Sequence, residues 1–196
     1  MSGTKVQATS LAAEMFANAQ FIFFERLRFF KQKACKTKEG AMGCSFVEYT
    51  DEDKKSALCK KVLDDLPLWF GIPEANREYC EKVRQYRFIG LVDNNREIGF
   101  FSIKQNNEFV FELYVLGILP QYHRKGYGKA AIEYICKDLR SRKAKYLEVK
   151  TLDESRESEE YQRTRLFYIN QGFIPLDVLT EVWGERNPCL LMIKQL

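Results

Sequence analysis

The chain has 196 residues, of which 45% are hydrophobic and 30% are charged, a composition typical of a globular protein. Its formal net charge is only +4 at pH 7, and Lys and Arg are interleaved with Asp and Glu, so charge does not indicate nucleic-acid binding. The Phe-rich run 21–30 is broken by charged residues and is shorter than the ~20 residues that a membrane-spanning helix needs. We therefore expect a globular protein that neither binds nucleic acid nor crosses a membrane.

The six cysteines form no Cys-x-x-Cys pair, and the only histidine is His123. Structural zinc sites use closely spaced Cys and His ligands, so no metal site is predicted. Glu14 interrupts the region where a secretory signal would need unbroken apolar residues. We therefore expect a cytoplasmic protein whose thiols stay reduced and pack as small apolar side chains.

Residues 1–43 are predicted to form an N-terminal extension that precedes a domain spanning residues 44–196. Apolar residues from Leu11 to Phe30 recur at a helical spacing, although the composition of residues 21–30 also fits a strand. We predict a helix. The Phe-rich segment 16–30 is a candidate contact surface for a homodimer.

The first part of the domain is predicted to contain a strand at Ser45–Tyr49 and a helix from Thr50 to about Leu66. Thr50 is the expected N-cap, because acidic residues that favour a helix start follow it. Pro73 is predicted to begin a second helix. Three antiparallel strands in a meander then follow, at Arg87–Asp93, Glu97–Lys104 and Phe109–Leu119, joined by turns at Asn94-Asn95 and Asn106-Asn107.

The pattern becomes helical after Pro120 and extended again at Tyr146–Thr151. A strand–helix–strand crossover predicts that the two strands are parallel. A further helix is expected at Glu159–Gln171, ended by Gly172, and two strands near 173–180 and 189–194 close the sheet. The predicted fold is α/β (α+β), with a mixed, largely antiparallel central sheet, a β-α-β crossover and flanking helices.

The stretch 119–129 leaves a strand and opens a helix, and it carries the most specific chemical signal. Gly126 and Gly128 allow backbone N–H groups to approach a ligand, and the helix N-terminus adds partial positive charge. Three basic side chains add full charges, those of Arg124, Lys125 and Lys129. The segment is therefore a candidate pyrophosphate-binding loop.

Two other phosphate-binding loops are excluded by spacing. A Walker loop requires Gly and a hydroxyl residue at the positions held here by His123 and Ala130. A dinucleotide-binding loop requires three glycines after the first strand of a parallel sheet, whereas this loop has two and follows a meander.

The run Gln121-Tyr122-His123-Arg124-Lys125-Gly126-Tyr127-Gly128 resembles the cofactor loop of the GNAT superfamily of acetyltransferases, with His123 in place of the usual Gln or Arg. Downstream, residues 165–173 resemble the superfamily's helix that ends in Tyr, three residues and Gly-Phe, with Tyr168 as that tyrosine. Residues 183–189 resemble an ending found in uncharacterised bacterial members. The resemblance covers about residues 46–196.

This resemblance implies a GNAT fold, acetyl-CoA as cosubstrate, and direct transfer of the acetyl group to a small-molecule or protein amine in a ternary complex. It implies that Tyr168 protonates the departing thiolate and that the backbone near Ile118 receives the oxyanion. Tyr161 stands where members often have Asn. The implied cofactor-binding residues are Ile118, His123, Arg124, Lys125, Gly126, Tyr127, Gly128, Lys129 and Tyr161.

Glu112 is a candidate general base, because an alkylammonium must lose a proton before it can attack. Its position resembles that of the catalytic glutamate in histone-acetylating members, and a glutamate on a solvated sheet face is an equally good interpretation. Strand alternation predicts Phe111, Leu113 and Val115 on one face and Glu112, Tyr114 and Leu116 on the other.

Two functions without catalysis remain open. An acyl-CoA sensor would keep the loop and lack the acid and base, and an interaction module would use the segment 16–30. The presence of both Glu112 and Tyr168 favours the enzyme. A covalent cysteine mechanism is disfavoured, because the only histidine lies in the loop. The sequence does not distinguish a polyamine, an aminoglycoside, an amino acid or a protein N-terminus as the acceptor.

Overall fold

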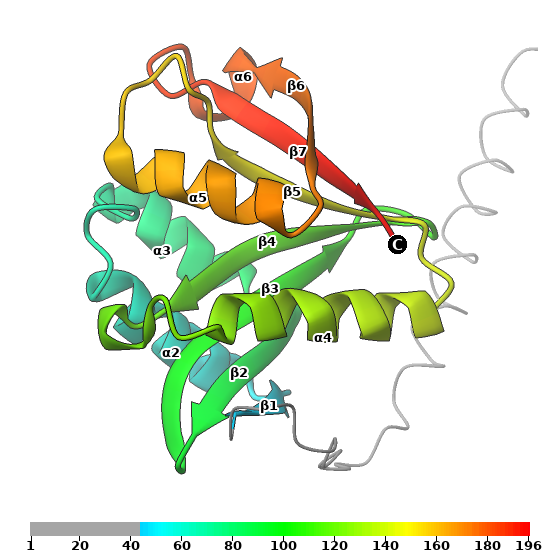
Figure 1. Cartoon of the computed structure of the whole chain (residues 1–196). Helices are drawn as coiled ribbons and strands as arrows, with labels where there is room; N and C mark the ends of the chain where they lie inside the picture. Colours follow the sequence, from blue (N-terminus) through cyan, green and yellow to red (C-terminus); the bar gives the residue numbers. More distant parts are fainter. Residues whose placement is uncertain (1–43) are drawn as a thin grey trace, which may run out of the picture. The chain divides into compact units, whose positions relative to one another are not determined.

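The computed structural model describes residues 44–196. The predicted N-terminal extension 1–43, with its helix and its Phe-rich segment, lies outside the described residues. In chain order the elements are β1 (Cys44–Tyr49), α2 (Glu52–Asp64), α3 (Pro73–Lys82), β2 (Arg87–Asp93), β3 (Arg96–Gln105), β4 (Val110–Ile118), the 3-10 turn η1 (Pro120–Tyr122), α4 (Tyr127–Ser141), β5 (Tyr146–Leu152), α5 (Glu159–Asn170), β6 (Ile174–Leu179), α6 (Thr180–Trp183) and β7 (Cys189–Gln195) (Figure 1).

The strands form one seven-stranded sheet in the order β1-β2-β3-β4-β5-β7-β6. Strands β4 and β5 pair in parallel through the α4 crossover, and every other pair of neighbours in this sheet is antiparallel. Helices α4 and α5 cover one face, and α2 and α3 cover the other (Figure 1). The predicted mixed sheet with a β-α-β crossover and flanking helices is confirmed.

Local signals set most element boundaries. The hairpin between β2 and β3 turns through Asn94 and Asn95, whose φ angles are 48° and 59°, as expected for a tight turn. Gly172 follows α5 with a φ of 82°, which a residue with a side chain rarely adopts. The N-cap of α2 is Asp51 and not the expected Thr50, because the Asp51 carboxylate accepts a hydrogen bond from the Lys54 N–H at 3.0 Å.

Each face of the sheet has its own apolar core. On the α4 side, Leu113 and Val149 from the sheet pack with Ala131 and Ile135 from the helix. On the α2 side the core contains ten buried residues, Leu58, Cys59, Val62, Leu63, Leu66, Val83, Phe88, Phe100, Val115 and Leu119. Strand β4, which leads to the 119–129 loop, is therefore covered on both faces of the sheet.

The predicted alternation along β4 is wrong beyond Leu113. Ser102 pairs with Val115, and the next residue, Ile103, pairs with Leu113, so Tyr114 is an extra residue that forms a β-bulge. The bulge reverses the orientation of the following side chains. Val115 therefore belongs to the α2 core, and Leu116 packs against the α4 core. Within residues 44–196, we find no helix with the length and apolar composition of a membrane span.

Candidate active site

Strands β4 and β5 separate before they end. They pair from Val110 and Tyr146 to Leu113 and Val149, and beyond that point β4 continues to Ile118 without pairing with β5 (Figure 1). Among residues 44–196, no strand pairs with the backbone groups of β4 that face this opening. An extended ligand with amide groups can pair with them as a strand would.

The last residues of β4 direct their backbone groups to both sides of the strand. The N–H of Leu119 donates to the carbonyl oxygen of Ile98 on β3, with 2.9 Å between nitrogen and oxygen. Because N–H groups of successive strand residues point in opposite directions, the N–H of Ile118 points away from β3 and toward the opening. It lies where the chain enters the 119–129 loop.

Backbone N–H groups are gathered in this loop. Arg124 and Gly126 have φ angles of 61° and 88°, so the backbone folds into a concave turn, and α4 begins directly after it. Within the described residues, the N–H groups from Arg124 to Lys129 have no backbone or side-chain acceptor. Such a turn at a helix N-terminus binds anionic oxygens.

Two side chains of the loop are engaged within the protein. The Nε2 atom of His123 lies 2.6 Å from the carbonyl oxygen of Ile118, and its ring contacts that of Trp69 edge to face. The hydroxyl of buried Tyr127 donates to Asp93 Oδ2 at 3.0 Å. These side chains brace the loop against β4 and the β2–β3 hairpin, so only the main chain of the two residues is available to a ligand.

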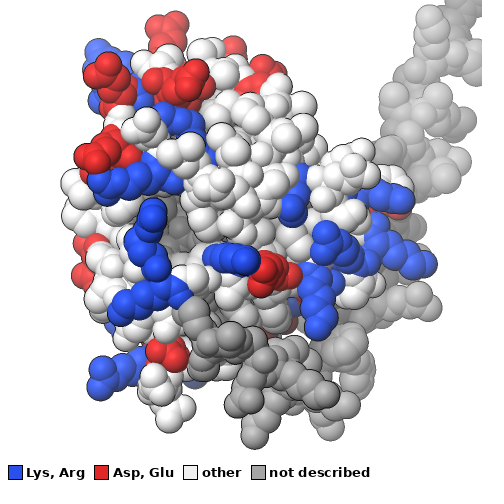
Figure 2. All heavy atoms as spheres, in the orientation of Figure 1, with Lys and Arg blue, Asp and Glu red and all other residues white. Residues whose placement is uncertain are grey.

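The loop's basic side chains are exposed. Lys125 Nζ lies 5.5 Å from the centre of the Tyr122 ring, and Lys129 Nζ lies 3.8 Å from Glu133 Oε1. Figure 2 shows Lys and Arg side chains around a recess on this face, between α5 and the start of α4. The surroundings of the loop therefore favour an anionic ligand.

Helix α5 places Tyr168 next to this region. The ring of Phe167 approaches the start of α4 so closely that a Cβ atom at Gly128 would lie 3.1 Å from it. Tyr168 is buried, and its hydroxyl makes no hydrogen bond within residues 44–196. Burial raises the pKa of the Tyr168 phenol well above its usual value, and the neighbouring Tyr161 and Tyr79 raise it further. The phenol therefore stays protonated at neutral pH.

The segment between α2 and α3 is attached to α5. The hydroxyl of Tyr161 donates to the carbonyl oxygen of Trp69 at 2.6 Å, and the indole Nε1–H of Trp69 donates to Thr164 Oγ1 at 3.1 Å. Tyr161, which the resemblance places near the cofactor, thus uses its hydroxyl to hold Trp69. Thr164 was missed by sequence reasoning, and its only signal is the helical i, i+3 spacing from Tyr161.

Glu112 is buried and ion-paired, so the interpretation as a solvated surface residue is wrong. Its Oε1 atom lies 2.8 Å from Lys150 Nζ and its Oε2 atom 3.4 Å from Lys104 Nζ. Burial lowers the pKa of the Lys150 ammonium, but the hydrogen bond and charge of Glu112 more than offset this, and the pKa is raised overall. The sequence did not indicate either lysine as a partner of Glu112, because only the pairing of β4 with β3 and β5 brings Lys104 and Lys150 close to it.

A cluster of tyrosine rings lies between α3 and β4. The rings of Tyr79 and Tyr114 lie 5.4 Å apart, and Tyr86 contacts Tyr114 at 4.9 Å. Burial raises the pKa of Tyr79, with further contributions from Tyr161 and Glu112 among its charged or ionisable neighbours. Tyr79 also raises the pKa of the Tyr168 phenol, so the phenols of both residues stay protonated at neutral pH.

The residues present fit coenzyme A and not a metal. The unpartnered N–H groups of residues 124–129 match the oxygens of a diphosphate, and the opening between β4 and β5 matches an extended chain with amide groups. Among residues 44–196, no group of three or more His, Cys, Asp and Glu side chains could hold a metal ion.

Comparison with known proteins identifies one family. The model of the acetyltransferase (GNAT) family matches residues 56–166. Among solved structures, a proposed GNAT acetyltransferase from Desulfovibrio desulfuricans is 17% identical, with a TM-score of 0.65 over 78% of this chain and 98% of that one. A GNAT acetyltransferase from Elizabethkingia anophelis with acetyl-CoA bound is 14% identical, with a TM-score of 0.59 over 79% and 99%.

A third similar structure is an aminoglycoside 6'-N-acetyltransferase complexed with coenzyme A, 20% identical, with a TM-score of 0.57 over 76% of this chain and 96% of that one. A comparison with curated proteins finds no match. At these low sequence identities the similarity to solved structures establishes only the fold. The match to the family model establishes that the chain belongs to the family.

Proposed function

The chain belongs to the GNAT family of acetyltransferases, and we propose that it transfers an acetyl group from acetyl-CoA to a primary amine by direct transfer in a ternary complex. The observation that carries this proposal is the row of unpartnered N–H groups from Arg124 to Lys129 beside the opening between β4 and β5. The bound acetyl-CoA and coenzyme A in two similar structures support it.

We assign coenzyme A binding mainly to the backbone of the loop. The N–H groups of residues 124–129 would hold the diphosphate, and the side chains of Arg124, Lys125 and Lys129 would add charge. Backbone groups of β4 that face the opening would hold the amide-bearing chain. The side chains of His123 and Tyr161 would contribute indirectly, because they form hydrogen bonds with the carbonyl oxygens of Ile118 and Trp69 and so fix the positions of these two residues.

The cosubstrate supplies an acetyl thioester, and the chain supplies the groups that move protons and stabilise charge. Ile118 N–H would donate to the carbonyl oxygen as negative charge develops on it. Glu112 would accept the proton of the ammonium, directly or through water, so that the amine lone pair can form the new N–C bond. As the C–S bond breaks, Tyr168, which stays protonated at neutral pH, would donate its proton to the sulfur, and the second proton of the attacking nitrogen would pass to the resulting tyrosinate to restore the phenol.

We propose that the acceptor is a small-molecule amine or a protein amine, and that the reaction takes place in the cytoplasm. Tyr79, Tyr86 and Tyr114 support an acceptor site on the α3 side of β4, because they form an aromatic cluster beside Glu112. The free thiols of the five cysteines in the described residues suit a reducing compartment.

The test is a thiol-release assay with acetyl-CoA and a panel of amines, combined with calorimetry of coenzyme A binding. Tyr168→Phe should lower kcat by about 10²-fold or more while coenzyme A affinity is kept. Tyr146→Phe, at a partly exposed tyrosine on β5, is the matched control and should leave kcat unchanged. Absence of coenzyme A binding to the wild type would refute the proposal, and binding without turnover of any amine would indicate an acyl-CoA sensor.

A further inference from the structure

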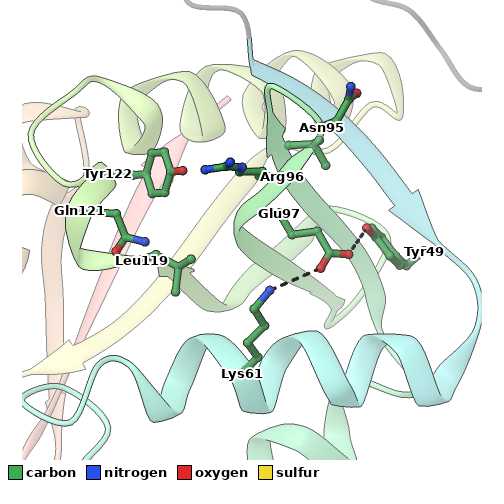
Figure 3. A pocket seen from close by; sticks show the side chains of 9 residues that line it. Tyr49, Lys61, Asn95, Arg96, Glu97, Leu119, Gln121 and Tyr122 are labelled. Carbon is green, nitrogen blue, oxygen red and sulfur yellow. Dashed lines mark hydrogen bonds and ion pairs between the residues drawn. The ribbon is translucent and has the colours of Figure 1, made fainter.

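A cavity of about 640 Å³ lies between Lys61 of α2, the β2–β3 hairpin and η1 (Figure 3). Its walls come from four elements: the C-terminal half of α2, the end of β1, the β2–β3 hairpin and η1. Its volume falls within the roughly 300–1,000 Å³ range of small-molecule sites. The proposed acetyl transfer uses neither the cationic side chains of this cavity, Lys61 and Arg96, nor its apolar ones, Val92 and Leu119.

The charges in this cavity do not cancel. Glu97 is engaged within the wall, because its Oε1 accepts a hydrogen bond from the Tyr49 hydroxyl at 2.6 Å. Its Oε2 lies 3.9 Å from Lys61 Nζ, which is longer than a hydrogen bond (Figure 3). The side chain of Arg96 makes no hydrogen bond or ion pair within residues 44–196. One guanidinium and the donors of one ammonium therefore remain uncommitted around the same space.

The rest of the lining suits an organic body attached to the anion. Leu119 is buried, and with Val92 it forms an apolar part of the wall, while Tyr122 presents an aromatic ring. In Figure 3, the side chains of Gln121 and Arg96 both extend toward the space between η1 and the hairpin. The cavity is much larger than a lone inorganic anion requires.

We propose that this cavity is a second ligand site, which takes a small molecule carrying a phosphate monoester. The phosphate would lie between Arg96 and Lys61, with the remainder of the molecule against Leu119 and Val92. A phosphate monoester has three terminal oxygens, so it can accept two hydrogen bonds from the planar guanidinium and still reach the ammonium. A carboxylate has only two oxygens and is the weaker match to two separate cations.

The phosphate has two candidate sources, a separate metabolite or the 3'-phosphate of coenzyme A. The 3'-phosphate is a candidate because η1 belongs both to the wall of the cavity and to the 119–129 loop. Tyr122 lines the cavity, and its ring lies 5.8 Å from that of Tyr127, the first residue of α4. The hydrogen bond from Tyr127 to Asp93 also fixes the hairpin that carries Arg96 relative to α4.

The first experiment is calorimetry of the full chain with phenyl phosphate, which combines a phosphate monoester with a flat apolar body. Arg96→Ala and Lys61→Gln should each weaken its affinity about tenfold. Lys137→Ala, which removes an exposed cation from α4, should leave the affinity unchanged. No measurable binding to the wild type, or equal affinity in wild type and Arg96→Ala, would overturn the proposal. If Lys129→Ala weakens the affinity for phenyl phosphate and Arg96→Ala does not, the phosphate binds at the cofactor loop. That result would also overturn the proposal.

The second experiment distinguishes the sources by comparing coenzyme A with 3'-dephospho-coenzyme A. If the cofactor's own phosphate occupies the cavity, the wild type should prefer coenzyme A about tenfold, and Arg96→Ala should remove this preference. If a separate metabolite is the ligand, the two compounds should bind equally to both proteins, while phenyl phosphate still depends on Arg96. Failure of both compounds to bind would count against the acetyltransferase proposal alone, since phenyl phosphate reports on the cavity independently.

Discussion

The hydroxyl of Tyr161 lies 2.6 Å from the carbonyl oxygen of Trp69 and donates a hydrogen bond to it, although the two residues are 92 positions apart in the chain. This bond joins α5, which carries Tyr168, to the segment between α2 and α3. The Trp69 ring also contacts His123 in the cofactor loop. Trp69 therefore connects three segments, which are α5, the α2–α3 connection and the 119–129 loop.

Tyr161→Phe removes this hydrogen bond and keeps the ring. We expect the free energy of unfolding to fall by about 1 kcal/mol, which corresponds to a Tm lower by about 2–4 °C for a domain of this size. The Trp69 carbonyl would lose its partner, so tryptophan fluorescence should change in the folded protein. Tyr146→Phe is the control, because Tyr146 is partly exposed. Equal Tm values for wild type and Tyr161→Phe would contradict the prediction.

The ion pair between Glu112 and Lys150 should contribute more to stability than the one between Glu112 and Lys104. Lys150 Nζ is 2.8 Å from Glu112 and its side chain is 22% exposed, whereas the Lys104 distance is 3.4 Å and its side chain is 37% exposed. Lys150→Met should lower the free energy of unfolding by about 2 kcal/mol, and Lys104→Met by less than about 1 kcal/mol. Urea unfolding of both variants measures the difference.

Substitutions at Glu112 and at its partner Lys150 also test whether Glu112 is the general base. If Glu112 accepts the amine proton, Glu112→Gln should lower kcat at pH 7 by about 10²-fold or more, while Lys150→Met lowers it far less, because only the first removes the proton acceptor. A similar small loss of kcat in both variants would assign Glu112 a structural role. Thermal unfolding of each variant checks that the comparison is made on folded protein.

Tyr49 should make the stability depend on pH in the alkaline range. Burial raises its pKa to about 12, and the hydrogen bond to Glu97 and the charge of Glu97 add to the shift. The folded-state pKa is thus above the unfolded value of 10.0. The contribution of Tyr49 is complete below pH 10 and is lost as the pH rises toward 12.

Tyr49→Phe cannot ionise, so its free energy of unfolding should fall less steeply between pH 10 and pH 12 than that of the wild type. Urea unfolding of both proteins at intervals across this range measures the two slopes. Parallel slopes would show that the Tyr49 phenol is not held in its protonated form by the fold.

Thr151→Val should stabilise the protein. The Oγ1 atom of Thr151 is buried and has no hydrogen-bond partner within residues 44–196, and Val replaces the hydroxyl with a methyl group of similar size. We expect Tm to rise by about 2–4 °C, which corresponds to about 1 kcal/mol. Thr180→Val, at an exposed hydroxyl, should not raise Tm. A lower Tm for Thr151→Val would show that this hydroxyl has a favourable partner in solution.

Order and type of the elements between residues 44 and 196 could be predicted because their signals are local. Pro73 begins α3, Asn94 and Asn95 turn the β2–β3 hairpin, and Gly172 ends α5, each through its own backbone preference. The 3-10 turn η1 and the short helix α6 were not predicted, since neither has a distinct pattern. The N-cap of α2 was misplaced by one residue, because Thr50 and Asp51 are both good caps.

The sequence by itself determined the loop that we propose for the diphosphate, because Gly126 and the helix start that follows it are contiguous and depend only on local backbone geometry. Only the tertiary structure decided what surrounds that loop. The bulge at Tyr114 arises from the pairing of β4 with β3, and the partners of Glu112, His123 and Tyr161 come from segments distant in the chain or from the packing of the loop. Backbone preferences act within a few residues, whereas buried polar groups take their partners from whatever the packed fold brings within hydrogen-bond distance.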